Sequence, residues 1–261
     1  MAHFYLIDEL VSTVVGELLS LRGSEGRHAA TVSRVRVGES LLVGNGRGLI
    51  VSTTALTVEK DVVTLEVTNV DGIALPTTQI TLVQALAKND RDERAVEACT
   101  ELGIDAILPW AAERSISKWE GPKVAKGRSR WGAIVREATK QSIRAYIPEV
   151  LAYEKASVFV KTLAGTQLIV LDPTGDVSLG EMSLPVSARH DESTSGVALS
   201  DGAPFASFAL IVGPEGGITP SELALLRANG ATIATLGKNI LRTSTAGPAA
   251  LAILSSRLRR L

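Results

Sequence analysis

The alternation of hydrophobic and polar positions changes character near residue 75. Before that point, short apolar runs are separated by turns that contain glycine, a pattern typical of β-strands. It predicts strands at residues 4–7, 40–43, 49–53 and 62–67, and one helical turn over residues 28–35. We therefore expect a small β-barrel in residues 1–74, an architecture that often binds nucleic acid, although a fold alone does not establish a function.

After residue 75, apolar runs alternate with segments of helical periodicity. Helices are expected over residues 91–102, from about residue 130, after Thr219 and after residue 243. Strands that alternate with helices indicate a parallel sheet, so residues 75–261 are expected to form an α/β domain. The apolar runs predict its strands at residues 80–86, 104–110, 167–170, 208–212 and 231–236.

Two helix starts are assigned from capping residues. Asp90 with Glu93 is expected to cap the helix over residues 91–102, because such side chains accept hydrogen bonds from first-turn amides. Residues 243–245 are expected to cap the last helix, with Pro248 in its first turn, where no amide proton is needed.

The stretch GPEGG at residues 213–217 directly follows the apolar strand over residues 208–212. Glycine lets the backbone approach a ligand closely, because it has no Cβ and adopts positive φ. Thr219, Pro220 and Glu222 then match a capping box with proline at the first helical position. This segment therefore predicts a strand, a ligand-binding turn and a helix.

The next strand ends in a second turn of this kind, residues 236–242, with the sequence LGKNILR. Two strands joined by a helix usually pair in parallel, which brings both turns to the carboxyl edge of one sheet. Open α/β sheets bind ligands at that edge. A third turn, residues 171–175, follows another apolar strand and is expected to reach the same place.

Length and composition describe an ordinary globular protein. The 261 residues are 45% hydrophobic and 21% charged, with a formal net charge of −1, so the global charge indicates no partner. The N-terminal stretch lacks a basic leader and no run of about 18 apolar residues occurs, so a cytoplasmic protein without a membrane span is expected. Cys99 is expected to be a small buried hydrophobe rather than a catalytic thiol.

Several common motifs are absent from the sequence. Neither a phosphate-binding P-loop nor a dinucleotide fingerprint occurs, and residues 44–48, GNGRG, favour a hairpin turn. His190 and Ser195, with two acids between them, suggest a hydrolase only superficially, because no nucleophile elbow surrounds the serine. They fall within residues 183–207, an expected long loop. The three histidines and one cysteine are scattered singly, so no metal site is expected.

A basic segment runs from Lys118 to Arg144, with eight basic residues, two acidic ones and hence a local net charge of +6. In a helix that begins near Arg130, the side chains of Arg136, Lys140 and Arg144 repeat every four residues and would form one charged ridge. Such a ridge is either an ordinary solvated helix face or a surface that binds a phosphate backbone.

With these features in place, the sequence resembles a known family, the RsmE-type bacterial small-subunit rRNA (uracil-N3) methyltransferases of the SPOUT superfamily. IVGPEGGIT at residues 211–219 and LGKNILRTSTA at residues 236–246 carry most of the resemblance. Residues 28–48 look like the family's PUA-like RNA-binding domain. Further matches, which extend the resemblance over nearly the whole chain, lie at residues 86–109, 112–118 and 130–150.

The resemblance implies a fold and a set of partners. The fold would be a PUA-like barrel in residues 1–74 followed by a SPOUT α/β domain with a trefoil knot in residues 75–261, assembled as a homodimer. S-adenosylmethionine (SAM) would be the methyl donor, and 16S rRNA or the assembled small ribosomal subunit the substrate. SAM would be bound by ten residues of the three turns: Leu171, Asp172, Gly213, Pro214, Glu215, Gly216, Leu236, Gly237, Ile240 and Leu241.

Arg242 and Glu215 are the catalytic candidates. Methylation of uracil N3 requires removal of a proton and stabilisation of the negative charge left on the base. The guanidinium of Arg242 would stabilise that charge or bind the target nucleotide, unless it pairs with a carboxylate in the fold. Glu215 would orient the target or accept the proton, unless it only stabilises a helix N-terminus. RNA contacts are expected from Arg34, Lys88, Arg91, Arg114, Arg136, Lys140 and Arg144.

Two positions depart from the family pattern. Many relatives carry an acidic residue where this chain has Ser244, and many carry a lysine near the position of Ala98, so any role of those side chains is replaced here. Two other interpretations remain, a non-catalytic RNA-binding protein with the same fold and a dinucleotide-dependent oxidoreductase. Binding of SAM distinguishes the methyltransferase from the non-catalytic RNA-binding protein, and binding of NAD(P) would favour the oxidoreductase.

Overall fold

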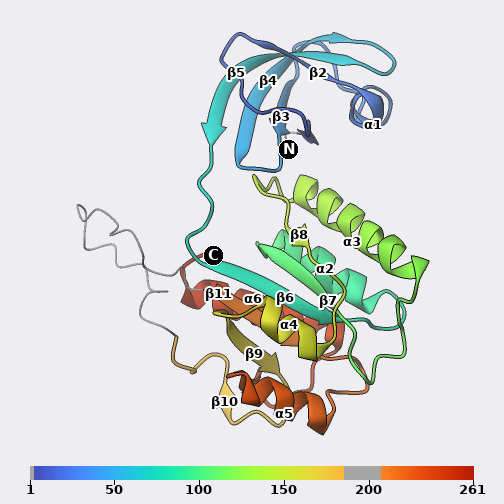
Figure 1. Ribbon diagram of the computed structural model, residues 1–261. Helices are drawn as coiled ribbons and strands as arrows, with labels where there is room; N and C mark the ends of the chain where they lie inside the picture. Colours follow the sequence, from blue (N-terminus) through green and yellow to red (C-terminus); the bar gives the residue numbers. More distant parts are fainter. Residues whose placement is uncertain (1–2, 185–206) are drawn as a thin grey trace, which may run out of the picture. The chain divides into compact units, whose positions relative to one another are not determined.

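The computed structural model describes residues 3–184 and 207–261. His190 and Ser195, with almost all of the expected long loop, lie outside the described residues. The chain forms two compact units (Figure 1). The first consists of Met1–Leu75 and Thr139–Ile147, and the second of Pro76–Ala138 and Pro148–Leu261.

The first unit is a curled five-stranded sheet, a half-barrel in the order β1-β3-β4-β5-β2. All of its pairings are antiparallel except that of β1 with β3. Along β4 and β5 buried residues alternate with more exposed ones, which gives the sheet one apolar face. The elements are β1 Phe4–Leu6, β2 Leu18–Leu21, α1 Gly23–Arg27, the π-helical turn η1 His28–Val32, β3 Ser40–Gly44, β4 Leu49–Val58 and β5 Val63–Gly72.

The four strands expected in this part of the chain are confirmed, and β2 is an additional one. Its sequence, LLSL, shows no regular alternation, so no strand pattern marked it. The hairpin expected at residues 44–48 is also confirmed, since they join β3 to β4. The side-chain oxygen of Asn45 accepts hydrogen bonds from the amides of Arg47, at 2.8 Å, and Leu49, at 3.1 Å. The turn is therefore held by its own side chain.

The expected cationic ridge is wrong. The helix α3, Pro122–Gln141, begins earlier than Arg130 and ends before Arg144, so the three basic residues do not share one helix face. Lys140 is 8% exposed, and its Nζ lies 3.1 Å from Oε1 of Glu25 in the same unit. The buried ion pair joins residues that are far apart in the sequence, which local periodicity does not indicate.

The second unit is built on a seven-stranded sheet in the order β10-β12-β9-β11-β6-β7-β8. Every pairing in it is parallel, which confirms the expected α/β organisation. Its strands are β6 Gln79–Ala85, β7 Ala106–Trp110, β8 Glu149–Val150, β9 Gln167–Leu171, β10 Val177–Ser178, β11 Ser207–Val212 and β12 Thr232–Thr235.

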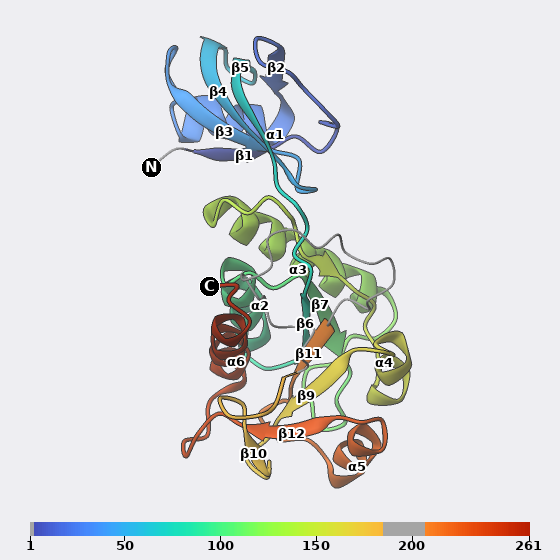
Figure 2. The ribbon, with the colours of Figure 1, turned by 90° about the vertical axis from the view of Figure 1, so that its left-hand side faces the viewer.

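Helices cover both faces of this sheet (Figure 2). On one face α2, Arg91–Glu101, packs against α6, Thr243–Arg257, and on the other α4, Ala156–Thr162, packs against α5, Pro220–Ala228. Cys99 on α2 is fully buried, as expected for a small hydrophobe, and burial raises the pKa of its thiol. None of the helices that the structure describes has both the length and the apolar character needed to cross a bilayer.

Two of the expected local arrangements are wrong. Strands β11 and β12 do not pair with each other, because β9 lies between them and pairs with both. Asp90 does not cap α2: its φ is 55°, whereas a capping residue is usually extended, and its side chain makes no capping hydrogen bond. Instead the buried Asp92 accepts hydrogen bonds from the amides of Ala87, at 3.1 Å, and Glu93, at 3.0 Å.

The start of α6 also differs from the expectation, whereas the start of α5 agrees with it. The N-cap of α6 is Arg242, and Pro248 lies beyond the first turn. At α5, Thr219 and Glu222 form the predicted capping box with proline at the first position. The reason for the difference at α6 is a buried hydrogen bond that engages the hydroxyl of Thr243, described with the site below.

Candidate active site

The parallel sheet brings the three glycine-bearing turns to one edge. Residues 171–175 follow β9, residues 213–217 follow β11 and residues 236–242 follow β12. Because these strands run in the same direction, with β9 in the middle, all three turns leave from their carboxyl ends. The edge at which ligands were expected is thus the place where the turns meet.

A cavity of about 280 Å³ lies between the turns that follow β9 and β12. Six of the ten residues expected to bind the cofactor line it: Leu171, Asp172, Leu236, Gly237, Ile240 and Leu241. The other four, Gly213, Pro214, Glu215 and Gly216, are not among its lining residues. The lining is completed by six residues outside the expected ten, of which three belong to the expected turns and three do not: Pro173, Lys238 and Asn239, and Ala234, Thr235 and Ala246.

The backbone of the turn after β12 is available to a ligand. Within the described residues, no hydrogen bond engages the amide groups of residues 237–242. Gly237 has a φ of 126°, a conformation that is essentially restricted to glycine. The opposite turn is held by Asp172, whose Oδ1 accepts hydrogen bonds from the amide and the hydroxyl of Thr174, at 2.9 and 2.6 Å. One wall is therefore fixed and the other presents free donors.

These residues fit SAM. Leucine and isoleucine side chains offer apolar contacts for a purine ring, and the free amides of the turn offer donors for polar groups of the ligand. No carboxylate or histidine cluster competes for the cavity as a metal site, since the described side chains include no group of three or more His, Cys, Asp or Glu residues that could hold a metal ion.

The GPEGG turn is hydrogen-bonded to the start of α6. The carbonyl of Gly213 accepts a hydrogen bond from Oγ1 of Thr243, at 3.0 Å, and that oxygen accepts one from Nε2 of Gln84, at 2.8 Å. Gln84 is fully buried in β6. The chain of hydrogen bonds ties the end of β11 to the start of α6. No role was predicted for Gln84 from the sequence. Its side-chain amide is the only one in the apolar run ITLVQALA, and a buried amide needs hydrogen-bond partners, so this position could have been recognised.

Glu215 lies in a charged cluster at the same turn. Its Oε1 accepts hydrogen bonds from the amide of Lys88, at 3.1 Å, and from Nη1 of Arg91, at 3.0 Å. Nη1 of Arg114 donates to the carbonyl of Gly216, at 3.2 Å. Three of the basic residues expected to contact RNA are thus brought together. Oε2 of Glu215 makes no hydrogen bond within the described part of the chain.

Arg242 is exposed at the end of the turn after β12. Its carbonyl accepts hydrogen bonds from the amides of Thr245 and Ala246, at 2.8 and 2.9 Å, which fixes its backbone at the helix start. Its guanidinium pairs with no carboxylate among the described residues, so the alternative of a structural ion pair is not observed. The two positions that depart from the family pattern are both half-buried. Ser244 lies in the first turn of α6, and Ala98 lies on α2.

The remaining basic candidates are divided between the two units. Arg34 is exposed in the first unit, where its φ is 54°. Arg144 also belongs to the first unit and Arg136 to the second, and both are half-buried. Lys140 is engaged with Glu25, as described above. The structure therefore assembles Lys88, Arg91 and Arg114 at one turn.

Comparison with known proteins identifies the family. Residues 74–255 match the RNA methyltransferase domain family. The ribosomal RNA small subunit methyltransferase E of Mycobacterium tuberculosis is 37% identical over 260 residues, which are 98% of this chain and 94% of that protein. The methyltransferase of the same name from Bacillus subtilis is 30% identical over 240 residues, 90% of this chain and 89% of that protein.

Solved structures agree with this assignment. The crystal structure of a ribosomal RNA small subunit methyltransferase E from Neisseria gonorrhoeae, bound to S-adenosyl methionine, superposes with a TM-score of 0.82 at 28% identity. It covers 98% of each chain. A family match over most of the chain and relatives of this identity over its whole length lead to one conclusion: this chain belongs to the RNA methyltransferase family that includes the ribosomal RNA small subunit methyltransferases E.

Proposed function

We propose that this protein transfers a methyl group from SAM to N3 of a uridine in 16S rRNA. The observation that carries the proposal is the cavity between residues 171–175 and 236–242, with its free backbone amides and apolar side chains. The names of the relatives support the substrate, and the Neisseria structure with its bound cofactor supports the donor. Ribosomal RNA as substrate implies a cytoplasmic enzyme.

SAM, when bound, supplies an electrophilic methyl group. Leu171, Leu236 and Leu241 would hold its apolar parts, and the amides of residues 237–242 would hold its polar groups. Gly237 makes this turn possible because its backbone conformation excludes side chains. Gly213–Gly216 would act through the hydrogen bond from Thr243 that anchors the neighbouring helix, rather than by lining the cavity.

Arg242 is the residue that we assign to charge stabilisation. Loss of the N3 proton leaves negative charge on the uracil ring and its carbonyl oxygens, and a guanidinium presents fixed donors that stay charged. Arg242 adjoins Leu241 of the cavity and has no competing carboxylate among the described residues. Its position beside the donor site and its free side chain support this role.

Glu215 is the residue that we assign to orientation of the uracil or to removal of its proton. Its Oε1 is fixed by Lys88 and Arg91, while its Oε2 is free to accept a hydrogen bond from N3. Fixing one oxygen holds the carboxylate in place, which favours transfer by alignment. Lys88, Arg91 and Arg114 around it would bind the phosphates of the RNA.

We assign RNA binding by a PUA-like domain to the first unit. Its curled sheet and the exposed Arg34 support this assignment. Arg136 and Arg144 would add contacts, whereas Lys140 would hold the fold through Glu25 rather than touch RNA. The proposed substrate is naked 16S rRNA or the assembled small subunit, and activity assays on each distinguish the two.

A SPOUT domain with a trefoil knot is the proposed topology of the second unit. After β12 the chain returns across β9 and β11 to form α6 against α2: a Cβ on Gly247 would lie 3.1 Å from Leu82 and 3.5 Å from Cys99. A knot requires such a return. A homodimer is proposed because Ile240, 82% exposed, presents an apolar side chain at the cavity that a second copy would cover.

Calorimetric titration with SAM, followed by mass spectrometry of rRNA from a strain that lacks the protein, tests the function. We expect SAM binding and loss of one N3-methyluridine from 16S rRNA. RNA binding without SAM binding would support the non-catalytic alternative instead. Thermal stabilisation by NAD(P) and not by SAM would favour the oxidoreductase.

A further inference from the structure

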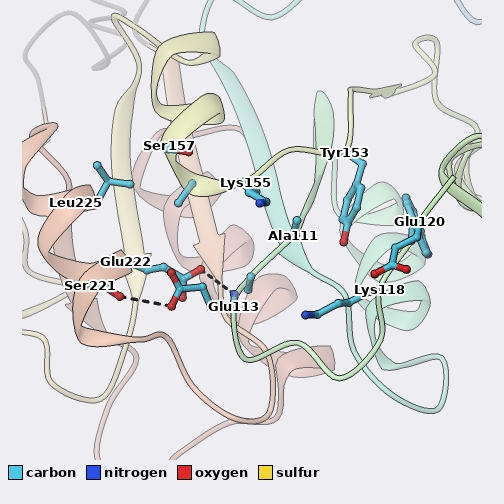
Figure 3. Close-up of a pocket in the computed structure, with 13 residues that line it drawn as sticks. Ala111, Glu113, Lys118, Glu120, Tyr153, Lys155, Ser157, Ser221, Glu222 and Leu225 are labelled. Carbon is cyan, nitrogen blue, oxygen red and sulfur yellow. Dashed lines mark hydrogen bonds between the residues drawn. The ribbon is translucent and has the colours of Figure 1, made fainter.

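A second pocket, of about 580 Å³, opens at the carboxyl edge on the face covered by α4 and α5 (Figure 3). Its volume lies within the usual range of small-molecule sites. None of its lining residues also lines the SAM cavity. Its charged side chains are those of Glu113, Lys118, Glu120, Lys155 and Glu222, and Trp119, Tyr153 and Ser221 add aromatic and polar surface.

The framework of the pocket is pre-formed by a buried carboxylate. Glu222 is 5% exposed and accepts hydrogen bonds from the amides of Glu113, at 2.9 Å, and Thr219, at 3.1 Å. This arrangement joins the connection after β7 to the start of α5. The hydroxyl of Ser221 lies 3.4 Å from Oε2 of Glu113 on the same side of the pocket. One wall is therefore rigid and polar.

The opposite wall is aromatic. The rings of Trp119 and Tyr153 lie with their centroids 5.2 Å apart at an interplanar angle of 46°, and Trp131 contacts Trp119 edge-on at 5.3 Å. Trp119 and Tyr153 are half-buried, so part of this wall faces the opening. A side chain at Gly127 would collide with the indole of Trp119, so glycine lets that ring lie against α3. A flat apolar ring of a ligand fits such a wall.

Two lysines complete the pocket. In Figure 3 Tyr153 and Glu120 lie on one side of the pocket and Glu113 on the other, and the side chain of Lys118 extends between the two sides. Lys155 lines the pocket from the start of α4. Neither ammonium group has a hydrogen-bond or ion-pair partner in the part of the chain that the structure describes. Free ammonium groups beside an aromatic wall suit a ligand that carries both a phosphate and a planar base.

We propose that this pocket binds one unpaired nucleotide of the substrate RNA, other than the nucleotide that is methylated. Its base stacks on Trp119 and Tyr153, Lys118 and Lys155 hold a phosphate, and the polar wall with Ser221 contacts the base edge. The methylated base must touch the SAM site, with which this pocket shares no residue, so the two nucleotides differ. That the nucleotide belongs to RNA rests on the proposed function.

Tryptophan fluorescence of the full-length protein tests the proposal, with uridine, cytidine, adenosine and guanosine 5′-monophosphates as probes. Saturating SAM is present, so that no probe enters the SAM cavity. Trp110 and Trp131 are buried, so quenching on binding reports Trp119. We expect saturable quenching that Lys155→Ala weakens roughly ten-fold. Lys126→Ala, at an exposed residue of α3 outside the pocket, should leave binding unchanged.

Methyl transfer to rRNA supplies a second readout. Lys155→Ala should raise KM for RNA roughly ten-fold without changing kcat at saturating RNA or the affinity for SAM. Trp119→Leu, which removes the fluorescent reporter together with the stacking surface, is read by methyl transfer alone and should also raise KM for RNA. Because Trp119 also packs on Trp131, the thermal stability of Trp119→Leu is compared with that of the wild type. If Trp119→Leu is unfolded, Lys155→Ala decides the outcome, because Lys155 is exposed.

Three results would overturn the proposal: no quenching by any monophosphate, equal affinities for Lys155→Ala and Lys126→Ala, or equal affinity for ribose 5-phosphate, which would mean an anion site only. Failure of the proposed function appears separately, as absence of SAM binding. In that case the titration without SAM still reports on the pocket, because Trp119 lies outside the SAM cavity.

Discussion

The two pockets at the carboxyl edge of the sheet are built in different ways. The cavity proposed to hold SAM is formed mostly by two continuous segments of the chain, residues 171–173 and 234–241, whose backbone is part of the lining. The pocket beside Trp119 is formed by side chains from three separate connections, after β7, before α4 and at the start of α5. The first was expected from glycine-bearing turns and the second was not.

The difference teaches what kind of site a sequence reveals. A site made of backbone requires glycine and turns at fixed places, which remain visible in the sequence whatever the rest of the chain does. A site made of side chains requires only that ordinary residues such as Glu113 and Lys155 meet in space. Substitutions that alter one pocket and leave the other intact therefore test whether the two sites depend on different parts of the chain.

The largest effect is expected from Arg242→Ala. Removal of a group that stabilises developing charge costs roughly 10²-fold or more in kcat. SAM affinity should change less than about three-fold, because the guanidinium is not among the groups that line the cavity. Single-turnover kinetics and calorimetry measure the two quantities.

Arg227→Ala is the matched control, since this exposed arginine on α5 lies 3.9 Å from Asp176 and outside both pockets. An Arg242→Ala variant that loses SAM affinity and turnover equally would contradict the role assigned to the side chain.

Glu222→Ala should come next, by a loss of stability. It leaves the part-buried amides of Glu113 and Thr219 without acceptors and removes the glutamate half of the capping box, at a cost of about 1–2 kcal/mol in the free energy of unfolding. Binding of nucleoside monophosphates should weaken, while SAM affinity stays as it is. Chemical denaturation measures the stability.

Ser221→Ala removes a neighbouring exposed hydroxyl, which lies 2.9 Å from Oγ1 of Thr219 and 3.4 Å from Oε2 of Glu113, and leaves the carboxylate of Glu222 in place, so it serves as the control. Equal stability of the two variants would show that the buried carboxylate does not hold this wall.

Gly237→Ala should lower the affinity for SAM about ten-fold, because Gly237 belongs to the turn that lines the proposed SAM cavity. Alanine at a φ of 126° is strained by roughly 1–3 kcal/mol, so the turn would move, although no atom lies within 4 Å of the added Cβ. Nucleotide binding beside Trp119 should be unchanged.

Gly132→Ala on α3 also adds a Cβ in open space, but at an ordinary helical φ, and should bind SAM normally. Unaltered affinity in Gly237→Ala would mean that the turn does not depend on glycine.

The smallest effect is expected from Arg114→Ala. Loss of one phosphate contact should weaken RNA binding a few-fold and lower the slope of log K against log salt by about 0.7 to 0.9. Both pockets should keep their small ligands, because Arg114 lines neither of them. An unchanged slope would place the cluster around Glu215 outside the RNA interface.

Much of the local structure followed from the sequence. Five of the seven strands of the parallel sheet, the capping box of α5 and the hairpin at residues 44–48 depend on residues close in sequence, and they were predicted correctly, whereas the two-residue strands β8 and β10 were not predicted. Thr243 was misplaced because its hydroxyl had two possible partners. It could cap its own helix, or it could join Gln84 and Gly213, and only the packing of α6 on the sheet selected the second.

The sequence by itself determined that an α/β domain follows a β-rich unit, and that glycine-bearing turns end three of its parallel strands. The tertiary structure decided that β9 lies between β11 and β12, that Lys140 is buried against Glu25, and that Glu113 meets Glu222. Hydrophobic periodicity and caps act over a few residues, whereas these contacts join residues up to 115 positions apart. Only the path of the whole chain brings such partners together.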